Sequence, residues 1–320
     1  MNTADRVLEI LYDRGETFVS LAELASAAGA GRRRVDAALQ ELGRRGHELE
    51  YAPAQGLRLV RPAGIDGRLI ERRLEGRRIG RSVLCFPAVG STNDVAFDSA
   101  RQGDTDGLVV LADSQNAGRG RQGRRWLSPP RTNLLMSALL LDESQSLRHE
   151  PLTIAAGLAV AQGLDDACGI ACRLKWPNDV LLGGAKLAGV LVEIRQSDGR
   201  RAVVVGVGVN VNAAPPAGEV DRPATCVADC LGHPAERNEV AAAVLVRLDD
   251  WIAAIARDDL SGLHDEWIAR CDMLNERLAV RWGERRCEGR VLDVSPLEGL
   301  VLCDDQGRTV HIPAAGATVL

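Results

Sequence analysis

The chain has 320 residues, a formal net charge of −5, 46% hydrophobic residues and 26% charged residues. This length allows two or three domains with a substantial core. The net negative charge excludes a general polyanion-binding protein, so any contact with nucleic acid has to come from a local basic patch. The sequence has no apolar run long enough to span a membrane, and its polar start is unlike a signal peptide, so we expect a cytoplasmic protein.

The first 62 residues have the pattern of a small winged helix-turn-helix domain. Apolar residues at helical spacing predict three helices, Ser20 caps the second, and a glycine turn precedes the third. Two short apolar runs around a Pro53–Gly56 turn then predict a hairpin. Three helices followed by a hairpin are typical of the winged helix-turn-helix. The helices are expected near residues 7–11, 21–28 and 32–45.

The charge of this domain is unusual for a protein that binds DNA. Residues 1–60 carry eight arginines and nine carboxylates, whereas DNA-binding domains are usually basic. Arg32, Arg33 and Arg34 nevertheless cluster at the start of the third helix, where base edges and phosphates are reached. Two interpretations stay open: the domain binds operator DNA through these arginines, or it is vestigial or binds protein.

The rest of the chain mixes strands with helices and then continues with strands alone. An arginine-rich linker leads into a helix near residues 65–74, and four short alternating segments after residue 272 predict a small β-barrel. We therefore expect an α+β protein with three domains, at residues 1–62, 63–272 and 273–320. Strands are expected at 108–112, 133–141, 187–196, 201–211, 278–282, 288–294, 299–303 and 309–312, and helices at 152–167, 238–256 and 260–270.

Only two of the 39 basic residues are lysines, namely Lys175 and Lys186. Arginine is a wide planar fork, whereas lysine is a compact charge on a slim stem. A chain that prefers arginine this strongly, yet keeps lysine at two nearby positions, predicts a site where one cation must fit beside a buried ligand. The alternatives are a buried salt bridge or chance.

The segment Gly118–Trp126, with the sequence GRGRQGRRW, is the second strong feature. Its glycines match the dinucleotide fingerprint GxGxxG, but that fingerprint opens an apolar helix, whereas arginines fill the gaps here. We interpret the segment as a cationic flap whose glycines let the backbone approach a ligand and whose guanidinium groups bind phosphate or carboxylate. Because like charges repel in an empty loop, we expect the flap to order on its ligand. The chain has no GxxxxGK[ST] motif, which excludes a P-loop protein.

Three shorter motifs complete the pattern. Lys175–Asp179, with the sequence KWPND, ends in a turn whose Asn178 and Asp179 either cap the backbone or bind a ribose, base or metal ion. The glycines of Gly206–Asn210 lie in a strand, where glycine often marks the close approach of a ligand. Ser91-Thr92-Asn93 precedes a predicted helix and is typical of an N-cap.

The eight cysteines and five histidines do not have the spacing of metal ligands, and they form no Ser/His/Asp or Cys/His pattern. We therefore expect reduced, mostly buried thiols and no metal site of the protein's own.

The motifs described above occur in the same order and spacing in biotin protein ligases, and the chain resembles this family over nearly its whole length. The N-terminal domain makes it similar to the bifunctional class, in which the biotin operon repressor is also the biotin–[acetyl-CoA-carboxylase] ligase. The resemblance implies a winged helix, a central ligase domain with a β-sheet packed by helices, and a C-terminal SH3-like barrel. It is carried by Ser91–Asn93, Gln115, Gly118–Trp126, Lys175–Asp179, Lys186–Gly189 and Gly206–Asn210.

The resemblance also implies a two-step reaction that uses ATP, biotin and Mg²⁺. Biotin's carboxylate attacks the α-phosphate of ATP, which gives biotinyl-5′-AMP and pyrophosphate. A lysine amine of a biotin carboxyl carrier protein, a subunit of acetyl-CoA carboxylase, then attacks the mixed anhydride. Preorganised cations suit the charge that builds on the α-phosphate. The implied catalytic residues are Lys186, Arg121, Arg119 and Lys175.

The implied binding residues fall into three groups, and Mg²⁺ is expected with ATP near Asp179. The biotin group comprises Ser91, Thr92, Asn93, Gln115, Arg119, Gly120, Arg121, Trp126, Lys186, Gly189 and Gly206. The nucleotide group comprises Arg121, Arg124, Trp126, Asn178, Asp179 and Asn210. The DNA group comprises Arg32, Arg33 and Arg34.

Repression would require a dimer, because two recognition helices reach successive turns of the major groove together. We expect residues 187–196 and 201–211 to be edge strands that pair between subunits, and the adenylate to promote this homodimer and its binding to operator DNA. Three alternatives stay open. They are a ligase without repressor function, a lipoate-type ligase, which the Gly118–Trp126 loop disfavours, and a transcription factor with a sensor domain, which the two lysines disfavour.

Overall fold

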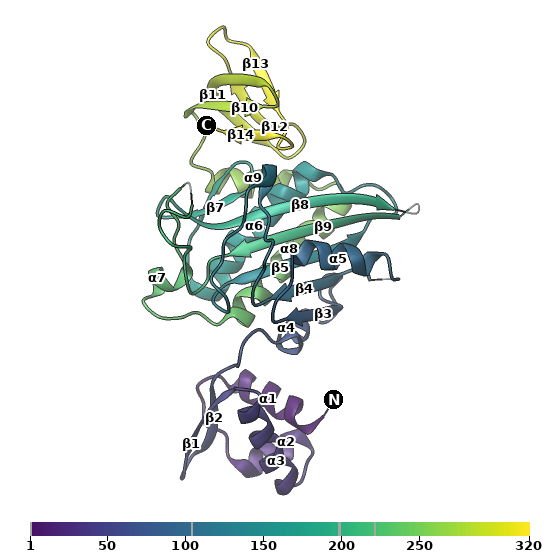
Figure 1. Cartoon of the computed structure of the whole chain (residues 1–320), viewed down its shortest axis with the longest axis vertical. Helices are drawn as coiled ribbons and strands as arrows, with labels where there is room; N and C mark the ends of the chain where they lie inside the picture. Colours follow the sequence, from purple (N-terminus) through teal and green to yellow (C-terminus); the bar gives the residue numbers. More distant parts are fainter. Residues whose placement is uncertain (1, 104, 198–199, 221) are drawn as a thin grey trace. The chain divides into compact units, whose positions relative to one another are not determined.

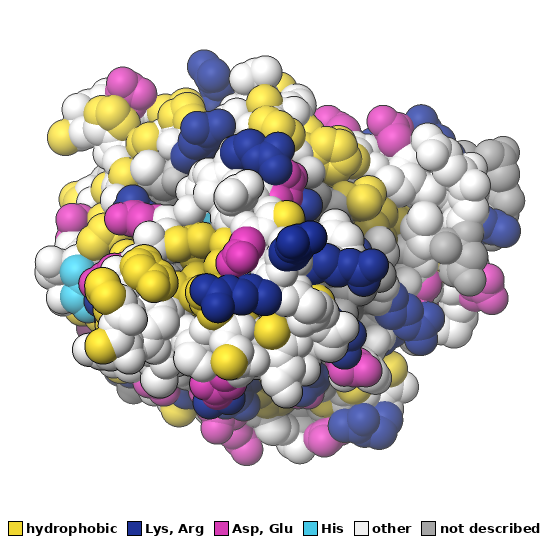
Figure 2. All heavy atoms as spheres, turned by 90° about the horizontal axis from the view of Figure 1, so that it is seen from below, with side chains coloured by type: hydrophobic (Ala, Val, Ile, Leu, Met, Phe, Trp, Pro, Cys, Tyr) yellow, Lys and Arg dark blue, Asp and Glu magenta, His cyan; other side chains and the backbone are white. Residues whose placement is uncertain are grey.

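The computed structural model describes residues 2–103, 105–197, 200–220 and 222–320. The chain separates into two compact units, Met1–Leu69 and Ile70–Leu320, called here the N-terminal and C-terminal units. Among the described residues, no helix has both the length and the apolar character needed to cross a membrane. On the face shown in Figure 2, Lys and Arg side chains are interspersed with Asp and Glu side chains.

The N-terminal unit contains three helices and a two-stranded antiparallel hairpin, as the sequence predicted. Ser20 caps the second helix, because its hydroxyl oxygen accepts a hydrogen bond from the amide of Glu23 at 3.1 Å. Gly29 ends that helix in the left-handed conformation. The elements are α1 (Thr3–Arg14), α2 (Leu21–Ala28), α3 (Arg32–Arg44), β1 (Glu48–Ala52) and β2 (Gly56–Arg61).

One apolar core holds the N-terminal unit together. Leu11, Leu24 and Leu42 come from the three helices and are fully buried, and Leu57 of β2 packs with them. Leu69 belongs to the same core, so the packing extends past residue 62, where we expected the domain to end. The next helix, α4 (Gly67–Arg73), begins within this stretch.

A seven-stranded mixed sheet is the frame of the C-terminal unit (Figure 1). The strand order is β3-β4-β5-β9-β8-β7-β6, in which β3 and β4 are parallel and the other neighbours are antiparallel. The long strands β8 and β9 form a hairpin that pairs from Ala188 with Val209 to Ser197 with Arg200. The strands are β3 (Ser82–Phe86), β4 (Leu108–Ala112), β5 (Leu134–Leu141), β6 (Arg173–Lys175), β7 (Asp179–Leu182), β8 (Ala185–Ser197) and β9 (Arg200–Val209).

Helices cover this sheet. α5 (Thr92–Ala100) packs on β4, β5 and β9, whereas α6 (His149–Cys168) packs on β6 to β9 and against α8 (Arg237–Ala256). Apolar residues occur all round α6 rather than on one stripe, which is typical of a helix buried on every side. Two further helices are α7 (Val227–Leu231) and α9 (Ser261–Arg270).

Residues 277–319 form a five-stranded antiparallel sheet with the order β13-β12-β11-β10-β14. Four of its strands lie where the sequence predicted strands. The sequence analysis missed β14, because three residues are too few to show alternation. The strands are β10 (Arg277–Trp282), β11 (Arg285–Ser295), β12 (Gly299–Cys303), β13 (Thr309–Ile312) and β14 (Ala317–Val319).

The prediction that residues 187–196 and 201–211 are edge strands is wrong for the second segment and for the start of the first, whereas residues 191–196 do lie at an edge. β9 lies between β5 and β8, and β8 pairs with β7 as far as Gly189. On the side of β7, the next residue, Val190, bonds to a side chain instead of a strand: the side-chain amide of Asn178 donates to the Val190 carbonyl at 2.7 Å. Of the described residues in these two segments, those of β8 beyond Val190 have β9 as their one strand neighbour. Apolar patterning looks alike in interior and edge strands, so the sequence could not separate them.

Candidate functional site

One cavity in the C-terminal unit is lined by most of the residues that the sequence analysis singled out. They come from the start of α5, the flap, the turn between β6 and β7, and the strands β8 and β9. Segments far apart in the chain thus converge on one concave surface, which is the usual form of a small-molecule site. The predicted residues that line it are Ser91, Thr92, Asn93, Gln115, Arg119, Gly120, Arg121, Arg124, Trp126, Asn178, Asp179, Lys186, Gly189 and Gly206.

Four oxygen atoms form a chain of contacts that we call the polar corner; Thr92, Asn93 and Gln115 line the cavity, and Ser137 is fully buried beside them. The chain of contacts runs from Gln115 Oε1 to Thr92 Oγ1, Ser137 Oγ and Asn93 Oδ1, with separations of 3.0, 2.7 and 2.6 Å. The two amide oxygens only accept hydrogen bonds, so three contacts share two hydroxyl hydrogens. One contact is left without a hydrogen, and the corner therefore favours a ligand that brings N–H or O–H donors.

Ser91 occupies the N-cap position of α5, as the sequence predicted, but its side chain does not cap the helix. α5 begins at Thr92, and the side chain of Ser91 makes no capping hydrogen bond. Ser91 is 5% exposed and lines the cavity. Its hydroxyl is therefore available to the cavity rather than to the helix end.

Glycines form the floor of the cavity. A Cβ at Gly208 would lie 2.5 Å from Cε2 of Trp126, and one at Gly189 would lie 3.0 Å from Cζ3 of the same ring. A Cβ at Gly206 would collide with the side-chain amide of Asn93. Glycine in this strand predicted the close approach of a ligand; in the structure the side chains of Trp126 and Asn93 lie against these glycines.

The flap is a closed loop fastened to β14. The amide of Gly120 donates to the Arg124 carbonyl at 2.7 Å, which closes the loop on itself. Gln122 Nε2 donates to the Ala317 carbonyl at 3.1 Å, and the Thr318 hydroxyl donates to Gln122 Oε1 at 2.5 Å. Arg121 also donates to the Ala317 carbonyl, at 3.1 Å, and burial lowers the pKa of its guanidinium.

Asp179 lies among cations on the other side of the cavity. Its carboxylate is 2.5 Å from Lys186 Nζ and 3.9 Å from Arg222 Nη1. Burial lowers the pKa of Lys175, as does the charge of Arg222, whereas Asp179 opposes this shift. Asp179 also opposes the lowering of the pKa of Arg121. The cations outnumber this one carboxylate, so this side of the cavity attracts a polyanion.

Two predicted site residues, Lys175 and Asn210, do not line the cavity. Lys175 lies at the end of β6, next to the turn that carries Asn178. Asn210 is 2% exposed, and its side-chain amide donates to the Thr225 carbonyl at 3.1 Å. Asn210 therefore supports the loop that carries Arg222.

Sequence analysis missed four parts of the site: Ser137, Glu193, Arg222 and β14. Ser137 and Glu193 interrupt apolar strands, and a polar residue inside such a run was an available signal. Arg222 follows a loop rich in proline and alanine that has no motif, and β14 is too short for a pattern.

No cluster of three or more histidine, cysteine, aspartate or glutamate side chains suited to a metal ion occurs in the described part of the chain. Asp179 is the one carboxylate in the described lining of the cavity, and it is paired with Lys186. A metal ion would need most of its oxygen ligands from a bound phosphate and from water, which is the usual situation for Mg²⁺.

Residues 85–210 match the Biotin/lipoate A/B protein ligase family. A biotin–[acetyl-CoA-carboxylase] ligase of Paracoccus denitrificans is 37% identical over 231 residues, which cover 70% of this chain and 95% of that protein. The chain belongs to the biotin protein ligase family. This membership confirms the resemblance that the motifs indicated.

Comparisons with other biotin protein ligases also point to this family. The bifunctional ligase/repressor BirA of Bacillus subtilis (strain 168) is 33% identical over 211 residues, and the chain spans 65% of its length. The structure of a biotin protein ligase from Aquifex aeolicus in complex with biotin and ATP has a TM-score of 0.65 and 26% identity, and the match covers 75% of this chain and 99% of that one. The mixed α+β fold predicted from the sequence is confirmed by this likeness.

Proposed function

We propose that this biotin protein ligase activates biotin with ATP and transfers it to a lysine of a carrier protein. In the first step, a biotin carboxylate oxygen bonds to the α-phosphorus of ATP and pyrophosphate leaves, which yields biotinyl-5′-AMP. In the second step, the carrier lysine amine attacks the biotinyl carbonyl, AMP leaves, and an amide forms. We propose a cytoplasmic location, because the reaction consumes ATP.

The observation that carries this proposal is the place of Lys186. It is the one lysine in the described lining of the cavity, and its ammonium group lies 2.5 Å from Asp179 on the cation-rich side. An ammonium group at this point can neutralise both the attacking carboxylate and the α-phosphate. Stabilisation of developing charge by preorganised groups usually contributes more to the catalysis of phosphoryl transfer than any other effect.

We assign the polar corner to the uncharged polar end of biotin. The corner has a surplus of acceptors in Gln115, Thr92 and Asn93, and the ureido group of biotin supplies N–H donors. The rings and chain of biotin would lie over the glycines of β8 and β9, where Trp126 now packs. Trp126 would then move to cover the intermediate and exclude water.

The nucleotide is assigned to the other side, with Arg121, Arg124, Asn178, Asp179 and Arg222 around its phosphates and ribose. Mg²⁺ fits there only together with ATP, where Asp179 supplies one oxygen ligand and the phosphates supply others. Lys175 and Asn210 act from outside the cavity in this proposal. They support the turn that carries Asn178 and the loop that carries Arg222.

Biotin-dependent exchange of pyrophosphate into ATP tests the first step. The purified chain is expected to exchange pyrophosphate with biotin and not with lipoate. Exchange with lipoate instead would favour the lipoate-type ligase. Transfer to a purified biotin carboxyl carrier protein, followed by mass spectrometry, tests the second step, and failure to modify it would contradict the assignment of this partner.

A second function, repression of transcription, is proposed for the N-terminal unit. We propose that residues 1–62 are a winged helix-turn-helix, that residues 273–320 are an SH3-like barrel, and that residues 63–272 are the ligase domain. Arg32, Arg33 and Arg34 are all exposed at the start of α3, as contact with operator DNA requires. One similar protein is named a bifunctional ligase/repressor, which supports this proposal. Dimerisation would use the end of β8 beyond Val190.

A further inference from the structure

We propose that Glu193 is a positioning residue that ties the biotin-binding polar corner to the base of the flap. The proposal rests on the ligase function proposed above and deepens it. Glu193 lies on β8, outside every motif that the sequence analysis singled out. It does not line the cavity, so it acts through the residues that do.

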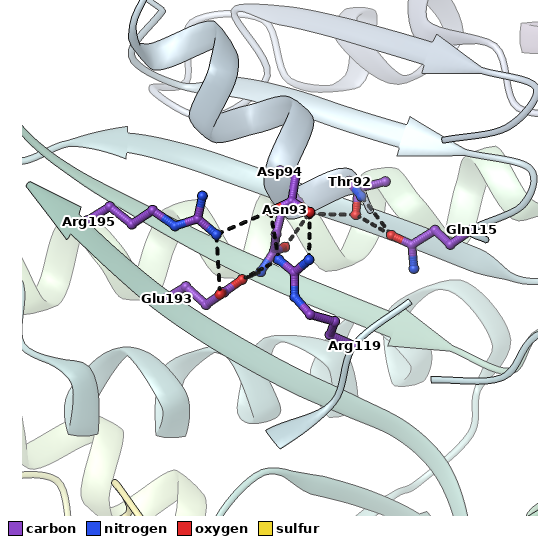
Figure 3. Close-up of polar contacts among 8 residues, drawn as sticks. Thr92, Asn93, Asp94, Gln115, Arg119, Glu193 and Arg195 are labelled. Carbon is purple, nitrogen blue, oxygen red and sulfur yellow. Dashed lines mark hydrogen bonds and ion pairs between the residues drawn. The ribbon is translucent and has the colours of Figure 1, made fainter. Parts of the chain in front are cut away.

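The central observation is one carboxylate oxygen that serves two site residues (Figure 3). Glu193 Oε2 accepts a hydrogen bond from Asn93 Nδ2 at 2.7 Å and another from Arg119 Nη2 at 3.2 Å. Asn93 belongs to α5, and Arg119 belongs to the flap. A single atom thus connects three separate elements of the site.

Glu193 determines which way the amide of Asn93 faces. With Nδ2 directed to Glu193, Oδ1 accepts the hydroxyl hydrogen of Ser137 at 2.6 Å. The amide of Asn93 packs against Gly206 of β9, and Asn93 is 4% exposed. The Asn93 side chain therefore has no room to move toward β9. Without the carboxylate, the amide can rotate and place a donor in a corner that is arranged to accept donors from its ligand.

Arg119 is held mainly by a different carboxylate. Asp94 accepts two hydrogen bonds from its guanidinium, at 2.5 and 2.8 Å. This pairing raises the pKa of Arg119 and lowers the pKa of Asp94. The longer contact to Glu193 adds a second anchor. Loss of Asp94 should therefore loosen the flap alone, whereas loss of Glu193 should affect the flap and the corner together.

Arg195 completes a neutral group of two arginines and two carboxylates. Its Nη2 lies 3.1 Å from Asp94 and 3.7 Å from Glu193, and its guanidinium lies 4.0 Å from the centre of the Phe97 ring. Arg195 shares a face of β8 with Glu193, because side chains two residues apart in a strand point the same way. If the Glu193 charge is removed, the group keeps one excess positive charge beside the flap.

The test compares Glu193→Gln with Asp94→Asn, each of which removes a charge and keeps its shape. Glu193→Gln is expected to raise KM for biotin in pyrophosphate exchange about tenfold, since charged hydrogen bonds are the strong ones. It should leave kcat within about twofold and KM for ATP unchanged, as expected for a binding effect. Asp94→Asn should raise KM for biotin less, because Asn93 keeps its charged acceptor, whereas Glu193→Gln offers it a neutral amide oxygen. Both variants should speed tryptic cleavage after Arg119 in the free protein.

Glu239→Gln is the matched control, because Glu239 also pairs with an arginine, Arg73 at 2.8 Å, away from the cavity. It should change neither KM nor cleavage. Glu193→Asp gives a second test if Glu193→Gln does not fold. The aspartate side chain keeps the charge but is too short to reach Asn93. This variant should also raise KM for biotin.

An unchanged KM for biotin in Glu193→Gln would overturn the proposal, as would an equal rise in Asp94→Asn. If the wild type lacks biotin-dependent exchange, the ligase function itself is contradicted. The cleavage comparison then still decides whether Glu193 anchors the flap, and equal rates in Glu193→Gln and wild type would refute it.

Discussion

The ammonium nitrogen of Lys186 lies 2.5 Å from Oδ1 of Asp179 and 5.6 Å from the centre of the Trp126 ring. The sequence left three interpretations of this lysine open: a ligand-binding cation, a buried salt bridge, and chance. The structure contains a salt bridge, but it stands in the wall of the cavity. The ion pair thus holds the ammonium group where the proposed reaction needs a cation.

Lys186→Arg is expected to reduce biotin-dependent pyrophosphate exchange by about 100-fold or more, because the wider guanidinium cannot take the same place. The far-ultraviolet circular dichroism should not change. Lys175→Arg is the matched control, because Lys175 lies outside the cavity. This variant should lose much less activity than Lys186→Arg. Near-normal exchange in Lys186→Arg would contradict the role given to this lysine.

Gly208→Ala is expected to weaken biotin binding about tenfold, measured by calorimetric titration, because the added Cβ displaces Trp126 from the cavity floor. Gly262→Ala is a suitable control, since a Cβ at that position meets no atom within 4 Å. If both variants bind biotin like the wild type, the glycine floor is not part of the biotin site.

Thr318→Val removes the hydroxyl that bonds to Gln122 and should loosen the flap. Loss of one hydrogen bond raises the open population about fivefold, so tryptic cleavage between residues 119 and 125 should accelerate by a similar factor. Biotin with ATP should protect the flap in both proteins. Thr309→Val changes an exposed position on β13, and trypsin should cleave this control variant at the same rate as the wild type. Equal cleavage with and without ligands would remove the ordering proposed for the flap.

Arg33→Ala is expected to weaken operator binding and to reduce the salt dependence of the binding constant by about one counterion, measured by gel shift at several salt concentrations. Arg14→Ala is the control, because Arg14 is paired with Glu23 at 2.8 Å on the same unit. Binding that is equally weak in both variants, or unchanged in both, would favour a ligase without repressor function.

Sedimentation with and without biotin and ATP tests the proposed dimer. A ligand-dependent increase in mass is expected if the end of β8 pairs between subunits. A monomer in both states would leave the ligase proposal intact and contradict the ligand-promoted dimer.

The sequence by itself determined most helices and most strands of both units, because apolar periodicity, the Ser20 cap and the glycine turns act locally. It also determined the family, since the flap, the KWPND turn and the two lysines are local patterns of residue type and spacing. Tertiary structure decided which strands are interior, which is why the edge expected at 201–211 was wrong and the edge expected at 187–196 holds only beyond Val190. It alone brought Glu193, Arg222 and β14 to the site. Those contacts join residues that are distant along the chain, and only the packing of the sheet with its loops brings them within hydrogen-bonding distance.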